Sequence, residues 1–332
     1  MRQAAWFLFL VVLLTSGVAF AQSPLMTQAT PRGFRQLKPP SVKFDFGPVI
    51  PGLRQNAVPQ GIAYTREQNK VIISHYLENT PSCLSVLDQS NGRMFASVLL
   101  KEAADKFHHG HVGGIAVLKD SLWVASDGSL LQYELAPLVS CQPPAAAVPV
   151  SKRSCETKAM FCTATDDKLF VGEFAYGRKF PTDPAHHVTD RKGVRKYAWV
   201  CGYSADDLFG KPRCVLSVRQ RVQGMCVTAD RVFLSLSYGR RNRSTIVVYR
   251  NPLREAAHST ATLRDGTKVP LWFLDGDNYL TEIDFPPMAE GIIMIGNRLA
   301  VLSESGATKY QPGGKGPLDV ILLLDVSKTG KR

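Results

Sequence analysis

A short phrase recurs five times along the chain and constrains its fold more than any other sequence feature. Each copy has a small residue, two or three apolar residues, a polar turn, and an apolar stretch that ends in Ser or Glu. The copies begin at Gln60, Gly113, Ala159, Gln223 and Glu290. Repeats of this size are typical of solenoids and propellers, in which each unit packs against its neighbours. The spacing between copies is irregular, so the connecting loops must differ in length.

A third apolar stretch follows each phrase, and often a fourth. After the first phrase come Cys83–Asp88 and Phe95–Leu100, and after the fourth come Thr245–Arg250 and candidates around Pro270–Asp275 and Tyr279–Phe285. The runs are short, rich in β-branched and aromatic residues, and bounded by turn residues, which indicates strands. Because four antiparallel strands repeated radially form a propeller blade, the sequence predicts an all-β propeller of about five four-stranded blades.

The two ends of the repeat region predict how the ring closes. The last unit ends in Asp319–Val326 and lacks a fourth strand, whereas a spare strand, Val42–Ile50, precedes the first phrase. If the spare strand completes the last blade, it removes an exposed sheet edge. We therefore expect one propeller domain over residues 42–326. Six blades remain an alternative if residues 177–221 or 250–285 contain a degenerate blade, and an extended β-sandwich is a simpler one.

The flanking segments predict export. A basic residue, an uncharged apolar core and the sequence Ala19-Phe20-Ala21 match a cleavable signal peptide over residues 1–21. Residues 22–41 are polar and contain Pro, which indicates a flexible leader, and residues 327–332 form a basic tail. The apolar core is too short for a permanent membrane span, and no later stretch is long and apolar enough to be one. We expect a secreted or periplasmic protein without a transmembrane segment after cleavage.

Seven cysteines lie after the predicted cleavage site, and export would allow them to form disulfides. Their neighbours in sequence suggest three pairs, Cys141–Cys155, Cys201–Cys214 and Cys162–Cys226, although sequence alone does not fix the connectivity.

The phrases resemble those of secreted bacterial propellers in the broad group that includes lactonase-like, phytase-like and NHL-type repeats. The stretch Glu290–Tyr310 looks closest to exported members of that group. This resemblance implies a propeller over nearly the whole mature chain. In the lactonase-like members, a Glu-Gly pair that opens an inner strand places its carboxylate on a channel metal, and Glu290-Gly291 resembles that pair. The Asn and Asp ligands of those proteins are missing from the matching positions here.

Propeller geometry predicts where a site would lie. The loop that enters each inner strand and the loop that leaves the second strand meet at the same end of the channel, so residues at these points should surround its mouth. The candidate ligand-binding residues are Gln60, His75, His108, His111, Asp127, Lys158, Glu173, Tyr176, Gln223, Tyr238, Arg240, Arg241, Glu290 and Glu304.

Histidines give a more specific hypothesis for this mouth. The run His108–Gly114 contains three His residues, and neutral imidazoles with carboxylates are common ligands of divalent metals. His75, His111 and Glu290 are the candidate metal ligands, and a bound metal would activate water for hydrolysis. The alternative is a polar, Gly-rich loop whose imidazoles only form hydrogen bonds.

Charge suggests a different function. The chain has a formal net charge of +12, and basic residues cluster after second strands, as at Arg240 and Arg241. A basic face attracts anionic small molecules, polysaccharides or acidic proteins. Nucleic acid is not expected as a partner, because no nucleic-acid fold signature accompanies the charge. No catalytic triad motif is present. The sequence therefore favours an exported binding protein, with a metal-dependent, lactonase-like hydrolase as the alternative.

Overall fold

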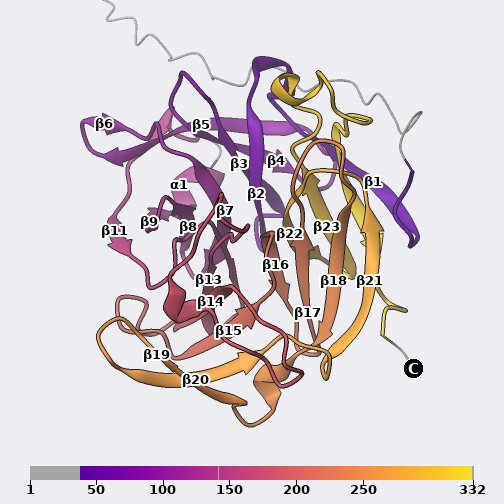
Figure 1. Cartoon of the computed structure of the whole chain (residues 1–332). Coiled ribbons are helices and arrows are strands. Elements are labelled where there is room, and N and C mark those ends of the chain that lie inside the picture. The colour runs from indigo at the N-terminus through magenta and orange to yellow at the C-terminus, as the bar shows by residue number, and fades with distance from the viewer. Residues whose placement is uncertain (1–37, 141, 331–332) are drawn as a thin grey trace, which may run out of the picture.

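Each recurring phrase forms the two inner strands of one sheet, and five sheets stand around a central axis (Figure 1). The structure is a computed structural model that describes residues 38–140 and 142–330. Neighbouring inner strands contact one another all the way around the ring. The predicted propeller of five blades is therefore confirmed. The inner strands are β2 (Val58–Thr65), β7 (Val112–Leu118), β12 (Phe161–Ala164), β16 (Val222–Val227) and β22 (Ala289–Ile295).

Blades 1 and 2 follow the repeat directly, with each strand antiparallel to the one before it. Blade 1 continues with β3 (Lys70–Tyr76), β4 (Cys83–Asp88) and β5 (Met94–Ala103), and gains the short β6 (Lys106–Phe107) and β10 (Ala146–Ala147) at its outer side. Blade 2 continues with β8 (Ser121–Ser126), β9 (Ser129–Glu134) and β11 (Ser151–Ser154), and α1 (Leu135–Val139) follows β9.

Blades 3 and 4 share a hairpin that the repeat does not predict. Blade 3 contains β13 (Lys168–Gly172), β14 (Ala198–Ser204) and β15 (Cys214–Val218), and blade 4 contains β17 (Arg231–Leu236), β18 (Ser244–Arg250) and β21 (Tyr279–Phe285). Between β18 and β21 the chain leaves blade 4, and β20 pairs in parallel with β15 on the outer side of blade 3 (Figure 1). Residues 177–221 and 250–285 thus supply outer strands and form no sixth blade. The hairpin strands are β19 (Ser259–Thr262) and β20 (Lys268–Phe273).

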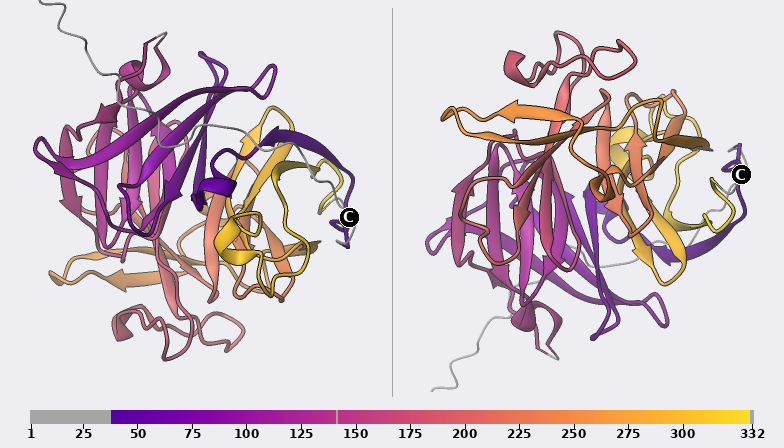
Figure 2. Two further views of the ribbon diagram at one scale, coloured as in Figure 1. Left: turned by 90° about the horizontal axis from the view of Figure 1, so that it is seen from above. Right: turned by 90° about the horizontal axis from the view of Figure 1, so that it is seen from below.

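The ring closes through the N-terminal strand, as the sequence predicts. Blade 5 contains β22, β23 (Arg298–Ser303) and β24 (Val320–Asp325), and β1 (Phe44–Val49) adds the outer strand. Strands β1 and β24 are antiparallel, with Phe44 opposite Leu324. Figure 2 shows the indigo start of the described chain beside the yellow C-terminal blade. The remaining elements are the 3₁₀ turns η1 (Leu53–Gln55), η2 (Pro184–His186), η3 (Pro252–Arg254) and η4 (Thr308–Tyr310).

The hydrophobic core is divided among the contacts between blades. Strand residues are buried on both faces, since each sheet packs against two neighbours, and five large clusters fill the five spaces between adjacent blades. Trp123 of blade 2 and Trp199 of blade 3, for example, lie in one such cluster, and both are essentially inaccessible to solvent. Stability therefore depends on every blade having both neighbours in place.

Glycines let the inner strands approach one another at one end of the channel. A Cβ on Gly61 would lie 2.7 Å from the Cα of Gly114, and one on Gly291 would lie 3.1 Å from the Cα of Gly61. Gly224 stands in the same relation to Gly291, at 3.0 Å. Side chains have no room there, so the residues just before these glycines are held at the channel mouth.

The predicted flanking segments are only partly described. The signal peptide and leader residues 22–37 lie outside the described residues, as do residues 331–332. Arg243 donates hydrogen bonds to the carbonyls of Lys38 and Pro39, which holds the last leader residues against blade 4. Arg231 binds Thr329 in the tail. In the part of the chain that the structure describes, no helix is long and apolar enough to cross a membrane.

Two of the predicted disulfide pairs are wrong. Cys201 and Cys214 occupy adjacent strands but pack on opposite faces of blade 3, in different core clusters. Cys162 packs between blades 2 and 3, whereas Cys226 packs between blades 4 and 5. All four are buried free thiols. For the third pair, Cys155 is also a buried free thiol, and Cys141 lies outside the described residues.

Candidate functional site

A cavity of about 570 Å³ opens at the channel mouth, where loops from the blades converge. Its volume is in the range of small-molecule sites in proteins. It combines an acidic floor, an aromatic wall and a basic rim. The lining residues are Gln60, His111, Lys158, Met160, Phe174, Lys179, Phe180, Pro181, Gln223, Ser237, Tyr238, Gly239, Arg240, Met288, Glu290, Glu304 and Tyr310.

Two glutamates of blade 5 form the floor. Glu290 lies in the inner strand β22 and is 4% exposed, and Glu304 directly follows the second strand β23. Their carboxyl groups are hydrogen-bonded to each other, which requires one shared proton. Gln223 Nε2 lies 3.0 Å from Glu290 Oε1, and Gln60 Nε2 lies 3.0 Å from Glu304 Oε2. Inner strands of the two neighbouring blades thus fix both carboxyls. We call Glu290 and Glu304 the carboxyl pair.

Burial changes the acidity of the carboxyl pair. It raises the pKa of Glu290 well above its usual value of 4.5, and the nearby charge of Glu304 adds to this increase. Burial also raises the pKa of Glu304 to about 7, although hydrogen bonds from Gln60 and Tyr310 and the charge of Lys309 act in the opposite direction. The pair therefore keeps a proton at neutral pH, which is a property of groups that exchange protons with a ligand.

Aromatic residues form one wall of the cavity. Phe174 and Phe180 pack edge to face, with ring centroids 5.2 Å apart. Tyr238 packs near both of them and against Tyr176, with a Tyr238–Tyr176 centroid distance of 4.1 Å and the two rings tilted by 33°. Such a wall offers flat apolar surfaces to a bound molecule.

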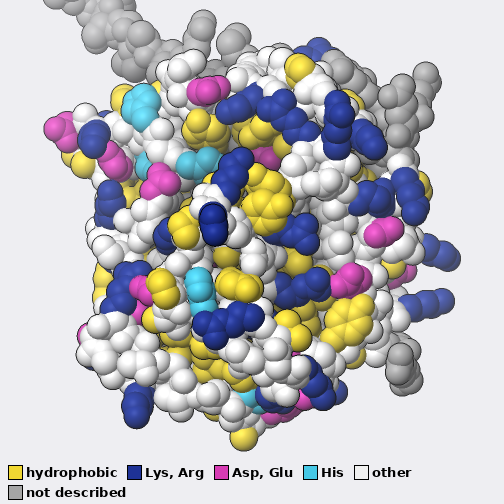
Figure 3. All heavy atoms as spheres, viewed as in Figure 1, with side chains coloured by type: hydrophobic (Ala, Val, Ile, Leu, Met, Phe, Trp, Pro, Cys, Tyr) yellow, Lys and Arg dark blue, Asp and Glu magenta, His cyan; other side chains and the backbone are white. Residues whose placement is uncertain are grey.

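Basic side chains form the rim of the cavity. The guanidinium of Arg240 lies 5.0 Å from the ring centroid of Tyr310, and Lys179 Nζ lies 5.5 Å from that of Tyr238. Lys158 donates a hydrogen bond to the carbonyl of Pro181. Figure 3 shows Lys and Arg side chains gathered around hydrophobic ones over the middle of one face. We call Lys158, Lys179 and Arg240 the rim cations.

The structure brings many of the sequence candidates together at this cavity. Residues that precede inner strands meet residues that follow second strands, as propeller geometry predicts. The candidates that line the cavity are Gln60, His111, Lys158, Gln223, Tyr238, Arg240, Glu290 and Glu304.

His75 does not lie at the mouth. Strand β3 continues to Tyr76, so His75 is a strand residue that is fully buried, and its Nε2 lies 2.8 Å from Ser85 Oγ. Burial lowers its pKa to about 3. Tyr76, the next residue, packs against the ring of His111, with ring centroids 4.9 Å apart. The proposed metal ligands His75, His111 and Glu290 are therefore not brought together, and the described residues contain no group of three His, Cys, Asp or Glu arranged to hold a metal ion.

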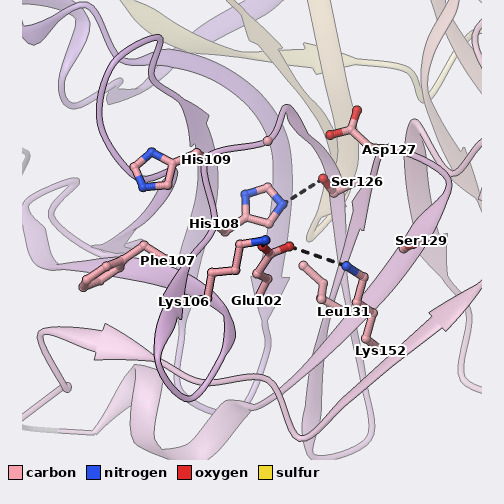
Figure 4. Close-up of a pocket in the computed structure, with 11 residues that line it drawn as sticks. Glu102, Lys106, Phe107, His108, His109, Ser126, Asp127, Ser129, Leu131 and Lys152 are labelled. Carbon is pink, nitrogen blue, oxygen red and sulfur yellow. Dashed lines mark hydrogen bonds and ion pairs between the residues drawn. The ribbon is translucent and has the colours of Figure 1, made fainter.

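His108 and Asp127 line a second, smaller cavity of about 210 Å³ (Figure 4). His108 is buried, its Nε2 lies 2.9 Å from Ser126 Oγ, and burial lowers its pKa. Asp127 turns back to accept a hydrogen bond from the His111 backbone N–H. These contacts fix the loop before β7, which positions His111 in the main cavity.

The remaining candidates, Glu173, Tyr176 and Arg241, do not line the mouth cavity, and their side chains contact other parts of the protein instead. Glu173 is buried, and its Oε1 accepts hydrogen bonds from the Trp199 N–H at 3.0 Å and pairs with His186 Nδ1 at 2.7 Å. Tyr176 supports Tyr238 from outside the cavity. Arg241 is exposed and donates to the Gly313 carbonyl.

Several cavity residues escaped the sequence interpretation. Phe174 lies two residues after the second strand β13, Phe180 and Tyr310 lie further along such loops, and Met160 and Met288 directly precede inner strands. The sequence contained one usable signal, since Phe174 and Tyr310 follow the same strands as the candidates Glu173 and Glu304.

The fold and this cavity define the class of protein as a five-bladed β-propeller with a small-molecule-sized pocket at its channel mouth. No family model matches the sequence, and no curated protein matches it. The structure is similar to the glutaminyl cyclase of Myxococcus xanthus, with 9% identity over 86% of this chain and 99% of that chain and a TM-score of 0.45.

Other similar structures are RS223-β-xylosidase and a GH43_1 enzyme from Xanthomonas citri complexed with xylotriose. The former has 10% identity over 85% of this chain and 94% of that chain, with a TM-score of 0.45. The latter has 11% identity over 88% of this chain and 93% of that chain, with a TM-score of 0.46. Similarity this low assigns no family, so the narrower resemblance to lactonase-like, phytase-like and NHL-type propellers stays a prediction.

Proposed function

We propose that this protein is an exported binding protein that holds an anionic small molecule, or the anionic end of a polysaccharide or protein partner, in the mouth cavity. The observation that carries this proposal is that the rim cations have no carboxylate partner in the described structure. Among the described residues, Lys158, Lys179 and Arg240 form no ion pair with a carboxylate, although many other basic residues do. Their positive charge is therefore available to a ligand.

The surroundings of the rim cations strengthen this attraction. They are exposed at the border of a concave surface with an aromatic wall, so a ligand that fills the cavity would displace water beside them, and charges interact more strongly where water is excluded. The chain also carries an excess of basic residues, which increases the rate at which anions reach the mouth.

A pair of matched variants tests the proposal. Arg240→Gln removes a cation that lines the cavity, and Arg241→Gln removes its exposed neighbour outside it. Ligand-observed NMR titrations would compare hexanoate with 1-hexanol, its neutral analogue. We expect hexanoate to bind more tightly than 1-hexanol, and Arg240→Gln to weaken hexanoate binding several-fold while Arg241→Gln leaves it unchanged. Equal binding of the two probes, or equal effects of the two variants, would refute the proposal.

A hydrolase is the second candidate, and the carboxyl pair favours it because a shared proton can be donated and taken up again. Glu290 and His111 of the predicted metal-dependent site do line the cavity, whereas His75 does not. Elemental analysis of protein purified without chelator is the test. A stoichiometric divalent metal that is lost in Glu290→Ala or His111→Ala would support the metal-dependent hydrolase and justify a screen of esters and lactones, and absence of metal would leave the binding function.

A further inference from the structure

Glu290 of the carboxyl pair differs from other buried acids of this protein in having no cationic partner. Asp275 is 2% exposed and pairs with Arg191 at 2.8 Å, and Asp190 is 7% exposed and pairs with Lys196 at 3.1 Å. Across the described ranges, neither Glu290 nor Glu304 has a Lys, Arg or His nitrogen within ion-pair distance. Buried charges are normally paired, so Glu290 lacks a cationic partner of the kind that Asp275 and Asp190 possess.

The cavity separates its unpaired charges by sign. The carboxyl pair occupies the floor, directly above the closely spaced glycines, and the rim cations border the opening. Neither group neutralises the other, since no rim cation forms an ion pair with Glu290 or Glu304 in the described structure. A ligand with a single negative charge would satisfy the rim and leave the floor without a partner.

We propose that the ligand of this cavity is dipolar, with an ammonium group that faces the carboxyl pair and an anionic group that faces the rim cations. This inference rests on the proposed binding function and names the chemical class of its ligand. An ammonium would replace the shared proton of the pair with charge-assisted hydrogen bonds, which are about twice as strong as neutral ones.

The donors around the carboxyl pair favour an organic cation over a metal ion. Gln60 and Gln223 direct their NH₂ groups, rather than their carbonyl oxygens, toward the carboxyls. Aromatic rings line the cavity beside them, including Tyr310, which is hydrogen-bonded to Glu304. Aromatic faces attract ammonium groups and alkyl chains alike, whereas a hard metal ion requires several oxygen ligands.

The experiment compares ω-amino acids with monocarboxylates of the same chain length. The probes are 4-aminobutanoate, 6-aminohexanoate and 8-aminooctanoate, each beside butanoate, hexanoate or octanoate, titrated by ligand-observed NMR at neutral pH. We expect at least one amino acid to bind about tenfold more tightly than its monocarboxylate, as a charge-assisted hydrogen bond in a water-poor site provides. If every amino acid binds no better than its monocarboxylate, the inference is wrong, while tight monocarboxylate binding would still support the anion-binding proposal.

A double variant tests whether the carboxyl pair causes the tighter binding of the amino acid. Glu290→Gln/Glu304→Gln keeps the shape and hydrogen-bonding capacity of the floor but removes its acidity, and Glu67→Gln removes an exposed carboxyl from the β2–β3 turn at the other end of the blade. We expect the double variant to lose the advantage of the amino acid and to bind hexanoate at least as well as the wild type. An advantage that persists in the double variant would place the ammonium elsewhere and overturn the inference.

Discussion

The pH dependence of stability is the sharpest physical test of the carboxyl pair. Folding raises the pKa of Glu304 from 4.5 to about 7. Between these pH values the folded protein binds a proton that the unfolded chain has already released, so the free energy of unfolding falls as pH rises. Each tenfold difference in proton affinity corresponds to about 1.4 kcal/mol, which gives a loss of about 3 kcal/mol across this window. Above pH 7 this contribution stays constant.

Buried histidines change stability in the opposite direction. The pKa of His75 falls from 6.5 to about 3 on folding, because burial disfavours its charged form. The unfolded chain then binds more protons below pH 6.5, and stability decreases as the solution becomes more acidic. The wild-type profile therefore contains both effects, and only a comparison with a variant that lacks the carboxyl pair separates them.

The assay is urea denaturation followed by tryptophan fluorescence at pH values from 5 to 8. We expect the stability of Glu290→Gln/Glu304→Gln relative to wild type to increase by at least about 3 kcal/mol between the two ends of this range, because the raised pKa of Glu290 adds to the contribution of Glu304. The histidines are unchanged in this comparison and cancel, and Glu67→Gln should follow the wild type throughout. A difference between double variant and wild type that does not change with pH would refute the burial of the pair.

Three further predictions follow from the site and the fold. The advantage of 6-aminohexanoate over hexanoate should grow between pH 5 and pH 8, as the carboxyl pair ionises, and NMR titrations that show no growth would contradict this. Gly113→Ala should destabilise the protein by more than about 3 kcal/mol in urea denaturation, since a Cβ there would lie 1.8 Å from the Met160 carbonyl oxygen; a shift below 1 kcal/mol would refute the close approach. Deletion of residues before Pro51 should lower stability and cause aggregation in light scattering, because it exposes the edge of β24; a stable, monomeric product would show that β1 does not close the ring.

The fold was predictable because its information is local and repeated. Each phrase carries its own turn and its own buried strand, so the spare strand at Val42–Ile50 could be assigned to the last blade by counting alone. The position of the hairpin β19–β20 was not predictable, since nothing in its sequence indicates that it pairs with blade 3. Parallel pairing with a distant strand depends on tertiary packing, which strand propensity does not record.

The candidate site was predictable where a residue directly adjoins an inner strand. Gln60, Gln223 and Glu290 precede glycines of the repeat, and the close approach of those glycines holds all three at the mouth. Prediction failed where strand length mattered. Strand β3 includes His75 and Tyr76, and adjacent strand residues point to opposite faces, so placing the strand end two residues early, at Ser74, selected the buried His75. The Cys201–Cys214 pair failed because proximity in sequence does not fix the face of a sheet, and the Cys162–Cys226 pair failed because the two residues lie between different blades.

The hairpin between β18 and β21 has a consequence for how the ring loses structure. In a simple propeller each blade contacts its neighbours only through side chains, so one blade can open while the next keeps its backbone hydrogen bonds. Here a segment of blade 4 is hydrogen-bonded into blade 3 (Figure 2), and separating the two blades must break main-chain bonds as well. In hydrogen exchange, the amides of blades 3 and 4 should open together as one cooperative unit. The aromatic wall and two of the rim cations stand on these two blades, so the wall is supported by the part of the ring least able to open one blade at a time.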